Sequence, residues 1–134
     1  MSQAAQLPEE DKPALQELSQ HVNKIIDAIY AYNKGEGGHD EIAQAFKNLL
    51  QDTKSKNALE KKLASYIISE LQLIHLKVKV KGKNYNVISF LEDYWAGKIT
   101  DKENVKLGFK GIAGPLMQRL LRYCKVDMIL DHYG

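Results

Sequence analysis

Residues 13–33 read PALQELSQHVNKIIDAIYAYN, and this stretch decides the fold class. Its large aliphatic residues recur at spacings of three and four, the period of one face of an α-helix. These residues are Leu15, Leu18, Val22, Ile25, Ile26 and Ile29. Pro13 suits the first turn of a helix, where its missing N–H is not needed. The pattern therefore predicts an amphipathic helix that runs to about Asn33 and is stopped by the glycines of residues 35–38.

Two further amphipathic segments follow, joined by a short polar connection at residues 53–56. Asp40 is of a residue type that accepts backbone N–H groups at helix starts, so we expect it to cap the second helix. The apolar stripe of that helix is Ile42, Phe46, Leu49 and Leu50, and the stripe of the third is Leu59, Leu63, Tyr66, Ile67, Leu71 and Ile74. Three amphipathic helices with short loops predict an antiparallel bundle.

The period changes from helical to alternating in residues 76–88, which read LKVKVKGKNYNVI. Apolar residues alternate with lysines, as in a β-strand with one buried face. Gly82-Lys83 suits a two-residue hairpin turn, and folding the chain there opposes Val80 with Tyr85. We therefore predict a short β-hairpin that packs on the helices. A longer third helix followed by a loop is the competing interpretation.

The last third of the chain carries start and stop signals for further helices. Asn86 suits the cap of a helix that Gly97 ends, and Thr100 opens a capping-box pattern for the next helix. Gly114-Pro115 then punctuates the chain, and Pro115 suits the first turn of another helix. The apolar positions of these helices are Val87, Ile88, Phe90, Leu91, Tyr94 and Trp95, then Val105, Phe109 and Ile112, then Leu116, Met117, Leu120, Leu121 and Cys124.

Together these segments predict a mainly α fold, a small single-domain helical bundle of about five to six helices. The bundle includes one short β-hairpin near residues 76–88 if the alternating pattern there forms strands. Residues 126–133 are apolar enough to be ordered, as helix or as strand. We expect residues 1–11 to be a flexible leader and residues 12–134 a single helical domain. A division into two subdomains, if there is one, would fall near residues 82–84.

The length and composition suit one domain with a sizeable core, since the chain has 134 residues of which 44% are hydrophobic. The single cysteine excludes an intramolecular disulfide and fits a reducing compartment. Residues 1–12 lack the basic start and apolar run of a secretory signal, and no stretch approaches the roughly 20 apolar residues that span a bilayer. We therefore expect a soluble, cytoplasmic protein, although these features leave signal-independent export open.

The net charge of +2 conceals an uneven layout. Residues 1–52 carry 4 Lys and 9 Asp or Glu, a net charge of −5; residues 53–85 carry 8 Lys and 2 Glu, a net charge of +6. Residues 86–134 carry 5 Lys, 2 Arg and 6 Asp or Glu, a net charge of +1. Such segregation indicates an interaction surface. Two complementary halves that face each other, or ordinary solvated helix faces, would give the same counts.

Sequence motifs for catalysis or for binding a metal or cofactor are lacking. The histidines at positions 21, 39, 75 and 132 form neither a HisxxxHis nor a His-Glu-x-x-His pattern, and CysxxCys is absent. Cys124 falls on the apolar positions of a predicted helix, where a buried, inert thiol is the usual outcome. The segment at Gly97 departs from a phosphate-binding loop because Glu92 stands where the first glycine belongs. We therefore expect no enzyme activity, no cofactor and no metal.

The lysines of the predicted hairpin form the most distinctive candidate surface. Its candidate binding residues are Lys77, Lys79, Lys81, Lys83 and Tyr85. The first three lysines share one face of a strand, where nucleic-acid phosphate, anionic lipid or an acidic protein patch could use them. Protection of an edge strand from aggregation explains the same lysines without a partner. The lack of any arginine before Arg119 counts against nucleic acid.

Aromatic residues and arginines supply the remaining candidates. Tyr30, Tyr32 and Trp95 lie at predicted helix ends, and such side chains are favoured both at interface centres and at the edges of an ordinary core. Arg119 and Arg122 stand one turn apart on a predicted helix, so they suit either a carboxylate ligand or a solvated helix face.

Three glycines recur every third residue, at positions 108, 111 and 114. On a helix they would form a smooth strip that allows another helix, of the fold or of a partner, to approach closely. The same glycines weaken the helix by up to about 1 kcal/mol each relative to alanine.

The function that these features favour is that of a non-enzymatic protein–protein interaction module, a regulator that docks on a partner as an adaptor or inhibitor. A homodimer would be compatible with the same surfaces. The alternative is a winged-helix-like nucleic-acid-binding protein, because three helices precede the lysine-rich hairpin. An enzyme with an unrecognised site is the third class of function.

Overall fold

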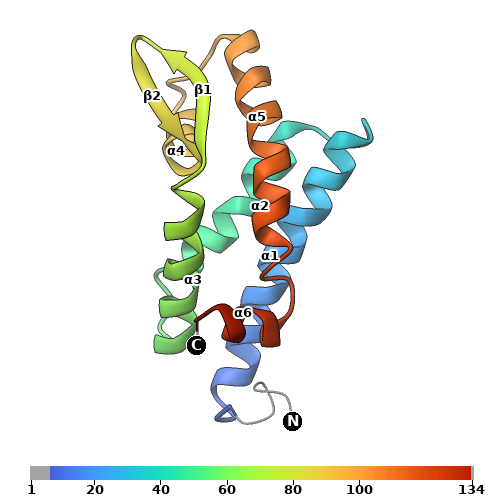
Figure 1. Ribbon diagram of the computed structural model, residues 1–134, viewed down its shortest axis with the longest axis vertical. Coiled ribbons are helices and arrows are strands. Elements are labelled where there is room, and N and C mark those ends of the chain that lie inside the picture. The colour runs from blue at the N-terminus through green and yellow to red at the C-terminus, as the bar shows by residue number, and fades with distance from the viewer. Residues whose placement is uncertain (1–6, 134) are drawn as a thin grey trace.

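The computed structural model describes residues 7–133, and within them the chain forms six helices and one two-stranded antiparallel sheet (Figure 1). The elements are α1 (Asp11–Asn33), α2 (His39–Asp52), α3 (Ala58–Leu71), β1 (His75–Val80), β2 (Lys83–Asn86), α4 (Val87–Trp95), α5 (Lys102–Leu120) and α6 (Val126–Tyr133). The predicted mainly α fold with a short β-hairpin is confirmed. Of the predicted leader, residues 1–6 lie outside the described residues; Leu7 packs half-buried against the core.

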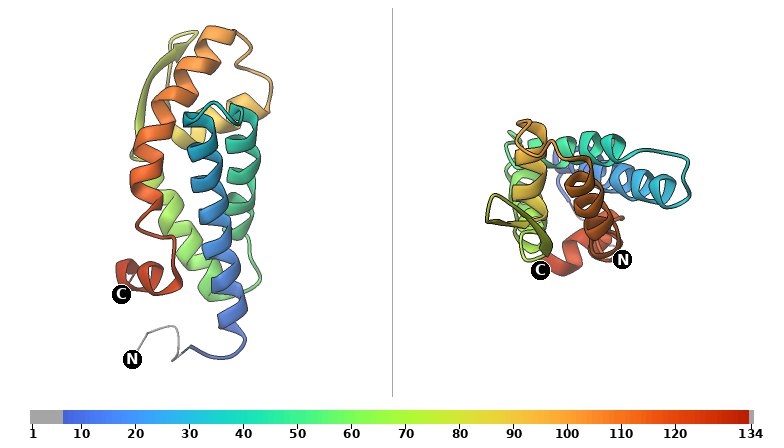
Figure 2. Two further views of the ribbon diagram at one scale, coloured as in Figure 1. Left: turned by 90° about the vertical axis from the view of Figure 1, so that its right-hand side faces the viewer. Right: turned by 90° about the horizontal axis from the view of Figure 1, so that it is seen from above.

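Helices α1, α2, α3 and α5 run up and down the long axis of the molecule (Figure 1; Figure 2). The hairpin and α4 lie at one end, and α6 lies at the other. Helix α1 is central, because it contacts α2, α3, α5 and α6. Five positions of its predicted stripe are fully buried, namely Leu15, Leu18, Val22, Ile25 and Ile29. The helical period of the opening stretch therefore supplies the middle of the core.

Glycines separate α1 from α2. Gly35 adopts a positive φ of 75°, which glycine reaches without strain, directly after Lys34 has closed α1. Gly38 is the N-cap of α2, so the prediction of Asp40 as the N-cap is wrong. Asp40 lies in the first turn instead, where the helix dipole favours a carboxylate. Its side chain accepts a hydrogen bond from the hydroxyl of Tyr94.

Helix α3 is shorter than its predicted stripe. It begins behind Asn57, whose side chain accepts the backbone N–H of Glu60 at 2.9 Å. It ends at Leu71, so Ile74 lies in the turn that leads into β1, although its side chain is buried as expected.

The hairpin turn is centred one residue earlier than predicted. Lys81 and Gly82 both have positive φ, 53° and 81°, as a type I′ turn requires, and Val80 pairs with Lys83. The predicted pairing of Val80 with Tyr85 is therefore wrong. The shift moves the partners by two residues, so the strands keep the same buried face. Pairing becomes irregular between His75 and Lys79.

Helix α5 differs from the prediction at its N-cap and at the predicted break. Asp101, not Thr100, is the N-cap, since its side chain accepts the N–H groups of Glu103 at 2.8 Å and Asn104 at 3.3 Å. The helix also continues through Pro115, so the predicted break at Gly114-Pro115 is wrong. The reason lies in one buried stripe that crosses the proline: Val105, Phe109, Ile112, Leu116 and Leu120. Packing this stripe as one helix offsets the single hydrogen bond that a proline removes.

The segment after α5 is a turn followed by helix α6, which settles residues 126–133 as helical. Cys124 lies in this turn and is half-buried, so its predicted place on a helical stripe is wrong. The backbone carbonyl of Cys124 accepts hydrogen bonds from Ser19 Oγ at 2.9 Å and Asn23 Nδ2 at 2.8 Å. These bonds fasten the turn to α1. Between residues 7 and 133 no helix combines the length and the apolar character that crossing a bilayer requires.

Candidate partner-binding surface

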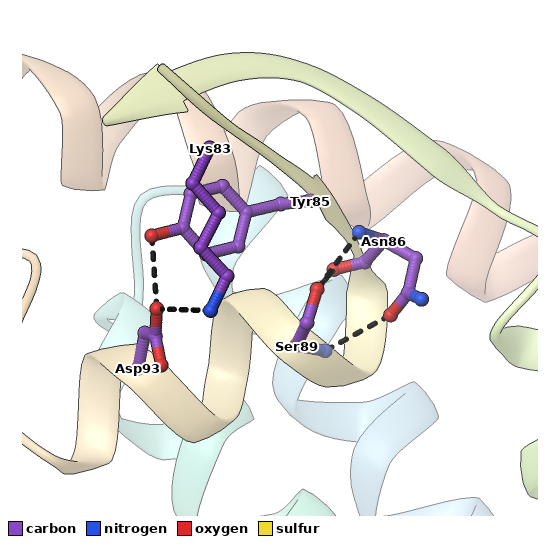
Figure 3. A network of polar contacts seen from close by, with 5 residues as sticks. All are labelled: Lys83, Tyr85, Asn86, Ser89 and Asp93. Carbon is purple, nitrogen blue, oxygen red and sulfur yellow. Dashed lines mark hydrogen bonds and ion pairs between the residues drawn. The ribbon is translucent and has the colours of Figure 1, made fainter. Parts of the chain in front are cut away.

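Asp93 of α4 holds the hairpin onto the helical bundle (Figure 3). Its Oδ2 accepts hydrogen bonds from Lys83 Nζ and from the Tyr85 hydroxyl, each at 2.9 Å. The hydrogen bond from Lys83, followed by the one from Tyr85, lowers the pKa of the Asp93 carboxyl below its usual value of 3.8. Tyr85 is 4% exposed and lies edge-on to Phe90 at a centroid distance of 6.0 Å. Lys83 and Tyr85 thus have partners inside the chain.

A capping box makes the passage from β2 into α4 rigid (Figure 3). The Asn86 side chain accepts the N–H of Ser89 at 2.9 Å, and the Ser89 hydroxyl accepts the N–H of Asn86 at 3.0 Å. Asn86 caps α4 as the sequence predicts. Because the same residue ends β2, the hairpin and α4 are positioned as one unit.

The lysines at positions 77, 79 and 81 are exposed. They differ from Lys83, which is also exposed but forms an ion pair with Asp93. Within residues 7–133 none of the three forms an ion pair. A second row of exposed lysines lies on α5, at Lys102, Lys106 and Lys110. Their spacing of four residues places them along one side of the helix. Two elements that pack against each other, β1 and α5, thus each carry a row of ammonium groups.

A groove of about 520 Å³ lies between β1 and α5. We call it the basic groove; its lining residues are His75, Leu76, Lys77 and Val78 from β1 and Leu107, Lys110, Gly111 and Pro115 from α5. Its floor is mainly apolar, and Leu107 is 55% exposed. Gly111 is part of this lining, and a Cβ there would make an ordinary contact, 3.9 Å from Leu76 Cδ2. The groove therefore offers apolar contact together with one lysine on each rim, Lys77 from β1 and Lys110 from α5. Lys102 and Lys106 line a separate pocket at the start of α5.

The aromatic candidates lie outside this groove. Tyr30 is 57% exposed, and Lys34 Nζ lies 4.4 Å from its ring centroid. Trp95 is half-buried, with Lys47 Nζ 5.4 Å from its ring centroid. Its indole N–H is buried without a hydrogen-bond partner among the described residues. Neither Tyr30 nor Trp95 is among the residues that line the basic groove.

Tyr32 lines a second pocket, of about 610 Å³, together with His39, Tyr94 and the start of α5. The ring of His39 stacks on Phe109 at a centroid distance of 4.8 Å, which fixes one wall. Burial, together with the hydrogen bond to Asp40, raises the pKa of Tyr94 to about 12. The Tyr94 hydroxyl donates to Asp40, and the tyrosine forms part of the pocket wall.

The two arginines do not share a helix, because α5 ends at Leu120 and Arg122 follows in the turn. Arg122 Nη1 lies 3.4 Å from Glu70 Oε1 of α3. The Tyr123 hydroxyl also donates to Glu70. Arg122 thus ties the turn to α3 through a carboxylate of the same chain, whereas Arg119 is exposed in the last turn of α5.

Sequence reasoning missed the contribution of α5 to this surface. Lys98, Lys102, Lys106 and Lys110 recur every fourth residue, and this spacing alone would have indicated a basic helix face.

Comparison with known proteins finds no family model, no curated protein and no solved structure that matches the chain.

Proposed function

We propose that the chain is a non-enzymatic protein-interaction module, an adaptor or inhibitor, whose basic groove takes an acidic and partly apolar segment of a partner protein. The observation that carries the proposal is an apolar floor with Lys77 and Lys110 in its lining, next to the other exposed lysines of β1 and α5. A cytoplasmic location is part of the proposal, in keeping with the single cysteine.

The spacing of the lysines favours an extended acidic segment. Alternate residues of a strand lie roughly 6.6 Å apart, and residues four apart on a helix lie about 6 Å apart along its axis. Both rows therefore present one positive charge every 6–7 Å or so, which matches acidic side chains at every second position of an extended chain. These charges raise the association rate, while burial of apolar side chains on Leu107 and its neighbours supplies affinity.

The apolar floor also separates this proposal from nucleic-acid binding. Phosphates would use the lysines and leave Leu76, Val78 and Leu107 without a role. Single-stranded nucleic acid is usually held by stacking on aromatic rings and arginines, and the described groove lining contains no Phe, Tyr, Trp or Arg. An acidic protein segment with interspersed apolar residues uses both the rims and the floor.

We expect the variant K77E/K79E/K81E to lose its partner, with capture from a lysate of the source cells falling by about tenfold or more, equivalent to about 1.4 kcal/mol. The matched control is K24E/K54E/K56E, which makes the same charge change at exposed lysines outside β1 and α5. Quantitative mass spectrometry of both captures, with cross-linking from position 110, measures the loss and locates the partner segment.

The supporting result is a protein that the control retains, that the groove variant loses, and whose cross-links fall in an acidic segment. Leu107→Ser should also weaken its binding without altering the dependence on salt, because it removes apolar contact only. Capture that is equal for both variants contradicts the proposal. Loss of capture after nuclease treatment also contradicts it, because the ligand would then be nucleic acid. A homodimer that forms through the groove in sedimentation analysis contradicts it as well.

A further inference from the structure

Four ionisable side chains from three helices meet at the junction of α1 with the α2–α3 connection. We call them the carboxylate–histidine cluster: Glu17 and His21 of α1, Asp52 at the end of α2, and Glu60 in the first turn of α3. His21 Nδ1 lies 2.6 Å from Asp52 Oδ2, and His21 Nε2 lies 3.8 Å from Glu17 Oε1. One donor atom from each of these three residues lies within 4.8 Å of the others.

Glu60 adds an independent observation. Its side chain is almost fully buried, at 4% exposure, and its Oε2 has no hydrogen-bond partner among the described residues. The Glu60 side chain is hydrogen-bonded to Ser55 and interacts electrostatically with Asp52, Glu17 and His21, so this carboxylate lies near the cluster. A buried carboxylate oxygen without a partner is costly, which makes an orphaned one a sign of a missing ligand.

The charges of the cluster call for a cation. Asp52 is 5% exposed and stands at the C-terminal end of α2, where the helix dipole disfavours a carboxylate. Burial raises the pKa of both Asp52 and Glu60. The charged groups that act on these two residues are Glu17, His21 and each other, without a lysine or arginine.

We propose that the carboxylate–histidine cluster is a binding site for a divalent transition-metal ion of the zinc or manganese type. His21 binds the ion through Nε2, because Nδ1 is engaged by Asp52, and a carboxylate on the second ring nitrogen is the usual way of orienting a metal-bound histidine. Glu17 and the orphaned Glu60 oxygen supply carboxylate ligands. An imidazole among oxygen donors favours zinc or manganese over calcium and magnesium.

The distance between the two proposed ligands on α1 suits a shared ion. Two ligands that are each about 2.1 Å from one ion lie roughly 3–4.2 Å apart, and the 3.8 Å between His21 Nε2 and Glu17 Oε1 falls in this range. Glu17 has a side chain that is 57% exposed, so it can rotate to close the site. A bound ion would join α1 to the start of α3. This inference does not depend on the proposed function of the basic groove.

The test is a titration of chelator-treated full-length protein with Zn²⁺ and Mn²⁺, followed by calorimetry and thermal unfolding, with Mg²⁺ as the comparison ion. We expect one ion per chain and a Tm that rises by roughly 5–10 °C at a hundredfold excess over Kd. Co²⁺ should give visible absorption bands that Zn²⁺ displaces. Glu60→Gln and Asp52→Asn should each weaken binding about 10- to 100-fold.

Two exposed residues provide matched controls, since Asp27→Asn on α1 and Glu103→Gln on α5 change the same chemical groups away from the cluster. Both should bind zinc as the unaltered chain does. The proposal is overturned if the unaltered chain shows no saturable binding, or if E60Q and D52N bind as tightly as the controls. It is also overturned if E60Q raises Tm while no ion changes the Tm of the unaltered chain. A proton on Glu60 would then be enough to neutralise the buried carboxylate without a metal ion. Circular dichroism of each ion-free variant confirms folding, and the two variants serve as independent checks.

Discussion

Gly108→Ala is expected to lower the free energy of unfolding by about 3 kcal/mol, the upper part of the range for an overpacked core. A Cβ at this position would lie 2.1 Å from Cζ and 2.3 Å from Cε2 of Phe90. Contacts this short force a ring or a helix to move. The Phe90 ring cannot yield easily, because it is fully buried and packs edge-on against Phe109 at a centroid distance of 5.4 Å and against Tyr85. The clash outweighs the gain in helix propensity of up to about 1 kcal/mol.

The matched control is Gly111→Ala, on the same helix. Its Cβ would make one ordinary contact, 3.9 Å from Leu76 Cδ2, so we expect an unchanged or slightly raised free energy of unfolding, by up to about 1 kcal/mol. Gly114 is less suitable, because it precedes Pro115 and a side chain before proline disfavours helical backbone. Denaturant unfolding followed by circular dichroism measures both variants. Equal effects of G108A and G111A would refute the assignment of Gly108 as the point of close approach.

These glycines also show what spacing alone can and cannot predict. The three-residue recurrence predicts a smooth strip, but the three positions face different surroundings. Gly108 meets the Phe90 ring of α4, and Gly111 meets Leu76 of β1. Among the described residues, no atom beyond the adjoining stretch of α5 lies within 4 Å of the Gly114 Cβ position. A three-residue step turns about 60° short of a full helical turn, so the strip drifts across the helix face. Only the packed neighbours decide which glycine is required.

Helix positions were predictable where the signal is local, whereas several helix ends were not. The stripe of α1 follows from spacing, and Asn86 follows from capping chemistry. At the start of α5 two adjacent residues, Thr100 and Asp101, both suit an N-cap, and the choice depends on which side chain reaches two free N–H groups. Pro115 is a strong local stop signal, yet the packing of a continuous apolar stripe overrides it.

In the candidate surface, too, local features were predictable from the sequence and contacts between distant segments were not. Alternation within β1 predicts that Lys77, Lys79 and Lys81 share a face. The pairing of Lys83 and Tyr85 with Asp93 depends on α4 folding back beneath the hairpin, which no local pattern reveals. The carboxylate–histidine cluster is hidden for the same reason. Residues 17 and 21 are one helical turn apart, but Asp52 and Glu60 join them only when α1 packs against the α2–α3 connection.

Asp93→Ala is expected to loosen the hairpin and to destabilise the protein more than Tyr85→Phe, which removes one hydrogen bond worth about 1 kcal/mol. The alanine leaves the buried Tyr85 hydroxyl without its acceptor and Lys83 without its counter-charge. We expect faster hydrogen exchange of the β1 and β2 amides and a lower denaturation midpoint. Glu92→Ala, an exposed neighbour on α4, is the control and should change the free energy of unfolding by no more than about 0.5 kcal/mol.

The effect of Asp93→Ala should depend on pH in a direction that the pKa of Asp93 fixes. The pKa of the folded carboxyl is lowered from 3.8, so the folded state holds its proton less tightly than the unfolded state does. The stabilisation by Asp93 is therefore fully present above the unfolded pKa and is lost as the pH falls through the folded pKa. The difference between D93A and the unaltered chain should be constant from pH 5 to 7 or so and should shrink on acidification below about pH 4. A difference that persists at low pH would mean that the ionised carboxylate is not what holds the hairpin, and that the loss of side-chain packing accounts for the destabilisation.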